Sequence, residues 1–270
     1  MPAIKRITVE NAAFQQFEAL LHNRRKRSRA GLFIVEGVKA VSLAIEREWP
    51  LYAVLFSQQV SDWAHDIVDR LESIERYQLS DSLMARLSQR EETSELLLVA
   101  QLRTPSLQEV TIAPPGLALV IDRPSSPGNL GTILRSTDAF GVDVVALTGH
   151  GADLFDPQTV RASVGTLFTQ PVVRAQSHGV ARALRDRMSS LGEAQIVGTS
   201  AKGDLELHEV DFTRPTVLVA GNETTGMSEG YRDLCDVTAK IPIIGAASSL
   251  NVACAASICL YEIARQRRTR

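Results

Sequence analysis

Apolar residues in the first hundred positions alternate between helical and strand-like spacing. Phe14, Phe17, Leu20 and Leu21 recur at intervals of three and four residues, as do the apolar residues that follow Val38 and Trp63, which predicts three helices. Continuous apolar runs, typical of buried strands, lie at 32–35, 51–56 and 95–100. This alternation predicts a small α/β domain.

The second half of the chain has a more regular pattern. Segments rich in apolar residues predict strands at 117–121, 142–147, 194–199 and 216–220, and segments with helical spacing separate them. Such an order predicts a mostly parallel sheet covered on both faces, and ligands usually bind beyond the carboxyl ends of its strands.

A proline-rich segment separates the two patterns. Residues 104–115 contain three prolines and no periodicity, which predicts a linker. We therefore expect one domain at 1–103, a linker at 104–115 and a second domain at 116–270.

Composition narrows the class of protein. Of the 270 residues, 44% are hydrophobic and 22% charged, as in globular proteins, and no apolar run approaches the roughly 20 residues that span a bilayer. The first residues lack the apolar core of a secretion signal, so we expect a cytoplasmic protein without a membrane segment. The three cysteines show neither paired spacing nor a nearby histidine pair, so we expect no metal site.

Positive charge is concentrated although the net charge is −2. Five cations lie within six residues just before the strand predicted at 32–35: Arg24, Arg25, Lys26, Arg27 and Arg29. A solvated loop is one interpretation. The position beside a strand favours the other, which is contact with nucleic-acid phosphates.

Residues 241–262 join a strand-like run to an apolar helix through a loop of small residues. Ser248 and Ser249 are candidate caps, and the first free N–H groups of the helix could hold a polar or anionic ligand. An ordinary strand-to-helix turn would have the same pattern. Neither a Gly-x-Gly-x-x-Gly loop after a strand nor a Walker lysine motif occurs, which argues against ordinary dinucleotide or ATP binding.

Three segments, at 119–141, 217–228 and 241–262, resemble in order the three motifs of the SpoU (TrmH) family of RNA ribose 2′-O-methyltransferases. The resemblance implies a knotted SPOUT α/β domain with a deep trefoil knot. Residues 24–46 are similar to the start of the family's small RNA-binding domain, a relative of the ribosomal-protein fold that binds kink-turns.

Site residues follow from matching motif to motif. The resemblance implies that S-adenosylmethionine is the cofactor and lies against Gly221, Ile241, Ile243 and Leu250. It implies that the catalytic group comprises Asn129, Arg135, Glu223, Ser249 and Asn251. A guanidinium is a poor base, so we expect Arg135 to bind phosphate and stabilise a developing alkoxide. We expect Glu223 to fix Asn129 or Arg135, and Asn251 to orient the loop of the second motif.

The expected reaction is 2′-O-methylation of a ribose in structured RNA, with 23S ribosomal RNA favoured over transfer RNA. The resemblance also implies a homodimer and no metal. A transfer-RNA ribose methyltransferase, a base-methylating SPOUT enzyme and a non-catalytic RNA-binding protein on the same fold remain alternatives.

The chain departs from the family pattern in the second motif. Where family members often have Glu-Gly-x-Gly, this chain has Glu223 followed by Thr-Thr-Gly. Asp122 and Asp138 are expected to be cap or surface carboxylates.

Overall fold

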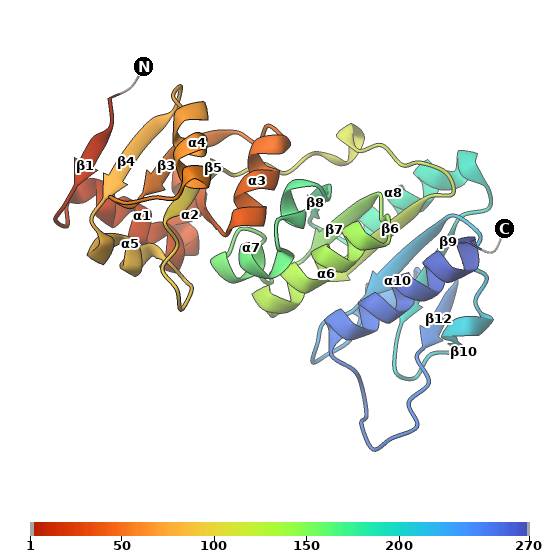
Figure 1. The fold of residues 1–270 in the computed structure, drawn as a ribbon. Helices are drawn as coiled ribbons and strands as arrows, with labels where there is room; N and C mark the ends of the chain where they lie inside the picture. The colour runs from red at the N-terminus through yellow and green to blue at the C-terminus, as the bar shows by residue number, and fades with distance from the viewer. Residues whose placement is uncertain (1–2, 269–270) are drawn as a thin grey trace. The chain divides into compact units, whose positions relative to one another are not determined.

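The computed structural model describes residues 3–268 and contains two compact units. The first unit comprises the chain up to Arg103 together with Asp153–Phe168. The second comprises Thr104–Ala152 and the chain from Thr169 onward. The chain therefore passes between the units three times (Figure 1).

The first unit is built on a five-stranded mixed sheet of order β1-β4-β3-β5-β2. Its strands are β1 (Lys5–Ile7), β2 (Leu32–Glu36), β3 (Leu51–Phe56), β4 (Glu75–Leu79) and β5 (Leu96–Gln101). Its helices are α1 (Ala12–His22), α2 (Arg24–Ala30), α3 (Val38–Glu46), α4 (Asp62–Arg70), α5 (Asp81–Leu87) and α7 (Pro157–Ser163). The three predicted strands and three predicted helices are present. Sequence pattern missed α2, α5, β1 and β4.

The segment Asp153–Phe168 belongs to the first unit although it was predicted within the domain at 116–270. Aromatic rings hold it there: Phe33 lies 4.8 Å from Phe155, and Trp49 lies 5.2 Å from Phe168, centroid to centroid. Gly165 has φ +90°, and a Cβ there would meet Leu43 Cδ1 at 2.7 Å. The predicted boundaries therefore differ from these units at residues 153–168.

The second unit is built on a seven-stranded, all-parallel sheet of order β10-β12-β9-β11-β6-β7-β8. Its strands are β6 (Leu117–Asp122), β7 (Val144–Thr148), β8 (Val172–Ala175), β9 (Gln195–Thr199), β10 (Leu205–Glu206), β11 (Thr216–Ala220) and β12 (Val237–Lys240). Its α-helices are α6 (Pro127–Ala139), α8 (Gly179–Met188), α9 (Glu229–Arg232) and α10 (Val252–Arg268). Short 3₁₀ turns lie at Leu107–Glu109, Ser189–Leu191 and Leu207–Glu209. Another 3₁₀ turn, Thr166–Phe168, belongs to the first unit.

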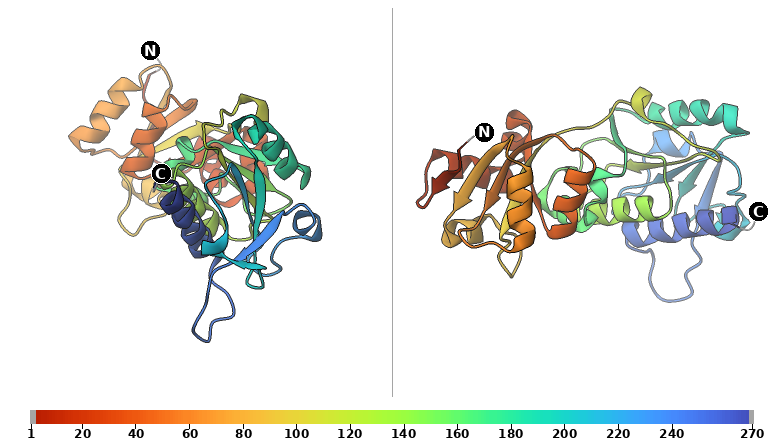
Figure 2. Two further views of the ribbon diagram at one scale, coloured as in Figure 1. Left: turned by 90° about the vertical axis from the view of Figure 1, so that its right-hand side faces the viewer. Right: turned by 45° about the horizontal axis from the view of Figure 1, so that its top comes forward.

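Helices cover both faces of this parallel sheet, as the sequence predicts. In Figures 1 and 2, α6 and α10 lie side by side on one face and α8 lies on the other. Every residue of β6, β7 and β11 is buried, because each strand packs on both faces. The four strands predicted here are present, whereas β8, β10 and β12 were missed.

The segment predicted as a linker, 104–115, packs within the second unit. Val110 is 5% exposed in its core, and Arg187 donates hydrogen bonds to the carbonyls of Leu107 and Val110. Within residues 3–268, no helix is long and apolar enough to cross a membrane. The same residues contain no cluster of three or more His, Cys, Asp or Glu side chains suited to a metal ion.

Candidate functional site

The turn after β6 leads into the helix that carries Asn129. Ser126 caps α6 by accepting a hydrogen bond from the Asn129 backbone N–H at 3.3 Å, and Pro127 occupies the first turn. Ser at the cap followed by Pro is a recognised start signal for a helix. Asn129 is thereby fixed inside the first turn, at the carboxyl end of β6, and is not itself the cap.

Glu223, in the loop after β11, accepts four hydrogen bonds from this turn. Its Oε2 accepts from Ser125 N (2.9 Å) and Ser125 Oγ (2.7 Å). Its Oε1 accepts from Ser126 N (3.1 Å) and Asn129 Nδ2 (3.1 Å). The expected link between Glu223 and Asn129 is present, and the two serines are partners that sequence reasoning missed.

These donors make Glu223 a persistent carboxylate. Burial raises the pKa of Glu223, but the hydrogen bonds from Ser125 and Asn129 outweigh burial and lower it to about 2. A carboxylate that weakly basic is a poor proton acceptor at neutral pH. Its geometry suits orientation of the Asn129 amide.

Asn251 completes the chain of amides from the third segment. Its Nδ2 donates to Asn129 Oδ1 at 3.0 Å, so one side of the Asn129 amide faces Glu223 and the other faces Asn251. Asn251 Oδ1 accepts from Ala253 N at 2.8 Å and caps α10. The cap is therefore Asn251 and not Ser248 or Ser249, and Asn251 orients Asn129 and not the second-motif loop.

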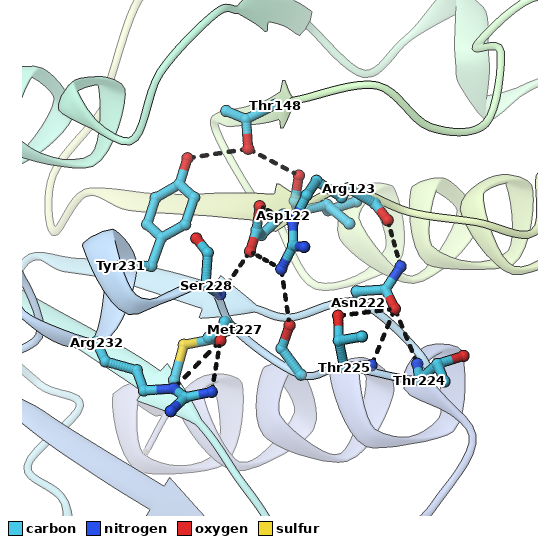
Figure 3. A network of polar contacts seen from close by, with 12 residues as sticks. Asp122, Arg123, Thr148, Asn222, Thr224, Thr225, Met227, Ser228, Tyr231 and Arg232 are labelled. Carbon is cyan, nitrogen blue, oxygen red and sulfur yellow. Dashed lines mark hydrogen bonds and ion pairs between the residues drawn. The ribbon is translucent and has the colours of Figure 1, made fainter.

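The second-motif loop, residues 221–228, folds tightly on itself. Asn222 and Gly226 pair through their backbones, and Asn222 Oδ1 accepts from Thr224 N and Thr225 N (Figure 3). A Cβ on Gly221 would lie 2.2 Å from Met227 N. The lack of a side chain at Gly221 is thus required by the loop's own backbone, independently of the cofactor that the family resemblance implies beside it.

Arg135 lies apart from this network. It is exposed on α6, and no side-chain hydrogen bond to it occurs among the described residues. Six residues turn a helix by about 240°, so Arg135 and Asn129 project about 120° apart. Arg135 is therefore available to a ligand or a partner chain, and this subunit alone does not join it to Asn129.

The residues expected around a cofactor lie in two places. Gly221 is buried after β11, whereas Ile241 begins the exposed loop 241–250 between β12 and α10, because β12 ends at Lys240. Ile243 is 36% and Leu250 38% exposed, and Ser249 is also exposed. Within the described chain, no hydrogen bond joins residues 241–250 to the second-motif loop. The strand predicted to run through Ile241 is wrong.

The cationic cluster forms helix α2, which Asn23 caps by accepting from Lys26 N at 3.0 Å. Arg24, Arg25, Lys26 and Arg29 are exposed there. Arg27 is 3% exposed; it pairs with Asp153 and Asp156 at 3.0 Å each and donates to the Leu20 carbonyl. The prediction that Arg27 contacts RNA phosphate is therefore wrong, because two carboxylates and a carbonyl already hold its guanidinium.

A parallel sheet with a polar network at the carboxyl ends of β6 and β11 is typical of a ligand-binding α/β domain. Residues 116–261 match the SpoU rRNA Methylase family, and residues 11–99 match the SpoU L30e-like domain. The chain belongs to the SpoU rRNA Methylase family.

Named relatives cover nearly the whole chain. It is 43% identical to a 23S rRNA (uridine(2479)-2′-O)-methyltransferase of Streptomyces viridochromogenes, covering 98% of this chain and 94% of the relative. It is 29% identical to the 23S rRNA (guanosine(2553)-2′-O)-methyltransferase RlmP of Bacillus subtilis, covering 90% and 92%. The crystal structure of the SpoU methyltransferase AviRb from Streptomyces viridochromogenes with AdoMet superposes with a TM-score of 0.89 at 41% identity, covering 96% and 99%.

Proposed function

We propose that this protein transfers a methyl group from S-adenosylmethionine to a ribose 2′-hydroxyl of 23S ribosomal RNA. The observation that carries the proposal is the continuous chain Glu223–Asn129–Asn251, which links one residue from each of the three motif segments. Both 23S rRNA methyltransferases named above match this chain over at least nine tenths of its length, which favours ribosomal over transfer RNA.

The loop 241–250 has the surface that an adenosine would need. Ile243, Ile244 and Leu250 are 36%, 103% and 38% exposed, although large apolar side chains are usually buried. Binding pockets combine apolar walls with backbone groups that read polar edges. We assign the cofactor to Ile241, Ile243 and Leu250 of this loop together with the backbone beside Gly221. When bound there, S-adenosylmethionine supplies an electrophilic methyl group on a sulfonium.

The chain's own residues position and polarise the RNA. The exposed guanidinium of Arg135 binds a phosphate and stabilises negative charge on the reacting 2′-oxygen. Glu223 holds the Asn129 amide in one orientation, and Asn251 holds it from the other side. Ser249, exposed two residues before Asn251, remains a proposed contact to substrate or cofactor.

Recognition of structured RNA falls to the first unit. Arg24, Arg25, Lys26 and Arg29 are exposed on α2 and would neutralise phosphates. The match of residues 11–99 to the SpoU L30e-like domain supports this division of labour. Because ribosomal RNA is the proposed substrate, we place the protein in the cytoplasm.

We further propose a homodimer formed through α10. Cys254, Ile258 and Tyr261 lie at helical intervals on its exposed side, and Ile258 and Tyr261 are 40% and 58% exposed. A two-fold interface would use the same patch on both subunits. Arg135 would then serve the partner's site, consistent with its direction away from Asn129.

Two experiments test these proposals. Wild-type protein incubated with labelled S-adenosylmethionine should label unmodified 23S rRNA and leave transfer RNA unlabelled; labelling of transfer RNA alone would overturn the substrate assignment. Mixing inactive Arg135→Ala and Asn129→Ala subunits should restore activity, because a mixed dimer keeps one intact site. A monomer by light scattering, or no restoration in verified mixed dimers, would contradict the shared site.

A further inference from the structure

Asp122 and Arg123, adjacent at the end of β6, hold the second-motif loop (Figure 3). Asp122 is 3% exposed. Its Oδ1 accepts from Arg123 Nε and its Oδ2 from Arg123 Nη2, both at 3.0 Å. Oδ2 also accepts from Ser228 N at 2.8 Å. A carboxylate expected at the surface thus fixes the far end of the loop.

Arg123 reaches the same loop twice. Its carbonyl accepts from Asn222 Nδ2 at 2.7 Å, and its Nη2 donates to the Gly226 carbonyl at 3.3 Å. Asn222 and Gly226 are the two residues that pair across the loop. One residue therefore contacts both arms of the loop that carries Glu223.

The backbone of Arg123 shows that this arrangement has an energetic cost. Its φ is +53°, in the left-handed region that non-glycine residues rarely occupy. Such strain persists where surrounding contacts impose it, and it is concentrated at functional sites. Gly149 makes room for the side chain, since a Cβ there would lie 2.5 Å from Arg123 Cγ.

We propose that Arg123, paired with Asp122, is a positioning residue for methyl transfer that acts through Glu223. The inference rests on the proposed function and deepens it. Asp122 and Arg123 hold the loop at Asn222, Gly226 and Ser228. The loop in turn keeps the Glu223 carboxylate in place to accept its hydrogen bonds from Ser125, Ser126 and Asn129. Without the guanidinium, the loop keeps its bond from Asn222 to the Arg123 carbonyl but loses the bond from Arg123 Nη2 to the Gly226 carbonyl. Asp122, which accepts from Ser228 N, also loses its ion pair with Arg123.

Three variants separate positioning from general stability. Arg123→Gly removes the guanidinium while relieving the positive φ, so the protein should fold. Arg123→Lys keeps a charge but not the forked contact with Asp122. Arg214→Ala is the matched control: the Arg214 side chain is 36% exposed against 37% for Arg123, and it pairs with Glu193 near the starts of β9 and β11.

Amide hydrogen exchange in the free protein gives the first measurement. Arg123→Gly should accelerate exchange of Thr224, Thr225 and Ser228 by about tenfold or more, Arg123→Lys less, and Arg214→Ala not at all. Equal exchange in wild type and Arg123→Gly would overturn the inference. This measurement needs neither RNA nor cofactor, so it stands apart from the proposed reaction.

Single-turnover methyl transfer into 23S rRNA gives the second measurement. Arg123→Gly should reduce the rate by about 10- to 100-fold with little change in RNA affinity, and Arg214→Ala should not. Adding Arg123→Gly to Glu223→Gln should cause little further loss, because both changes act on one element. Multiplied losses would overturn the inference, whereas an inactive wild type would overturn the proposed function alone.

Discussion

The amide of Asn129 donates to the carboxylate of Glu223 at 3.1 Å, although the two residues are 94 positions apart in the chain. This bond joins the first and second motif segments at the carboxyl edge of the parallel sheet. Since the pKa of Glu223 is about 2, the carboxylate accepts this bond throughout the physiological range. The Asn129 amide therefore keeps one orientation at any pH where the protein would work.

The ionised Glu223 should stabilise the second unit in a pH-dependent way. A folded-state pKa near 2, against an ordinary value of 4.5, contributes stability that is complete above about pH 5 and is lost as the pH falls toward 2. Glu223→Gln should therefore unfold at lower urea than wild type at pH 7, and the gap should shrink below pH 4.5. Glu193→Gln, at an 88% exposed side chain, is the control. A gap independent of pH would contradict this assignment.

Arg135→Ala should lose about 10²- to 10³-fold in methyl-transfer rate, the effect of removing one donor that stabilises developing charge. Arg135 is exposed, so thermal stability should change by no more than about 0.5 kcal/mol. Calorimetric affinity for S-adenosylmethionine should persist. Arg135→Lys should also fail, because an ammonium lacks the planar fork. Near-normal single-turnover rates in either variant would remove Arg135 from the reaction.

The exposed cations of α2 should set the salt dependence of RNA binding. Replacing Arg25, Lys26 and Arg29 by Ala should weaken binding and reduce the slope of log affinity against log salt by about 0.7 to 0.9 for each phosphate that is no longer neutralised. Cofactor affinity should not change. Arg27→Ala is an informative contrast: it leaves Asp153 and Asp156 without their buried partner and should cost ~3 kcal/mol of stability. An unchanged slope in the triple variant would make α2 an ordinary solvated helix.

Gly221→Ala should disturb the second-motif loop before any ligand is considered. The added Cβ would lie 2.2 Å from Met227 N and 2.4 Å from Gly226 C, and neither backbone atom can move without displacing the loop. Both thermal stability and S-adenosylmethionine affinity should fall. A variant as stable as wild type would show that the loop adjusts freely, contrary to its close packing around Gly221.

Sequence pattern predicted the parallel sheet well because β6, β7 and β11 consist mostly of apolar residues, and β9 has an apolar centre at Ile196 and Val197. It missed β12, where Val237–Lys240 mixes polar and apolar residues, and predicted a strand instead at 241–244, which is loop and largely exposed. Exposed apolar residues that could contact a ligand or a partner give the same hydrophobic pattern in the sequence as a buried strand.

Motif matching predicted Asn129, Glu223 and Asn251, but it could not give the contacts between them. Spacing alone does not show which cation of a run is buried. Arg27 is buried because it pairs with Asp153 and Asp156, which lie 126 and 129 residues away in the chain. Likewise, sequence pattern predicts a cap or surface carboxylate at Asp122, whereas the folded chain buries it and lets it accept a hydrogen bond from Ser228 N, 106 residues away. Long-range partners of this kind lie beyond local pattern.

The most direct test of the proposed reaction is mass-spectrometric mapping of unmodified 23S rRNA after incubation with the protein and S-adenosylmethionine. We expect a single nucleotide to be heavier by one methyl group, which is carried on the ribose and makes the RNA resistant to alkaline cleavage at that position. Asn129→Ala protein that still folds should leave the RNA unmodified. A methyl group on a base, or none on 23S rRNA with folded wild-type protein that binds the cofactor, would contradict the proposed 2′-O-methylation of 23S rRNA.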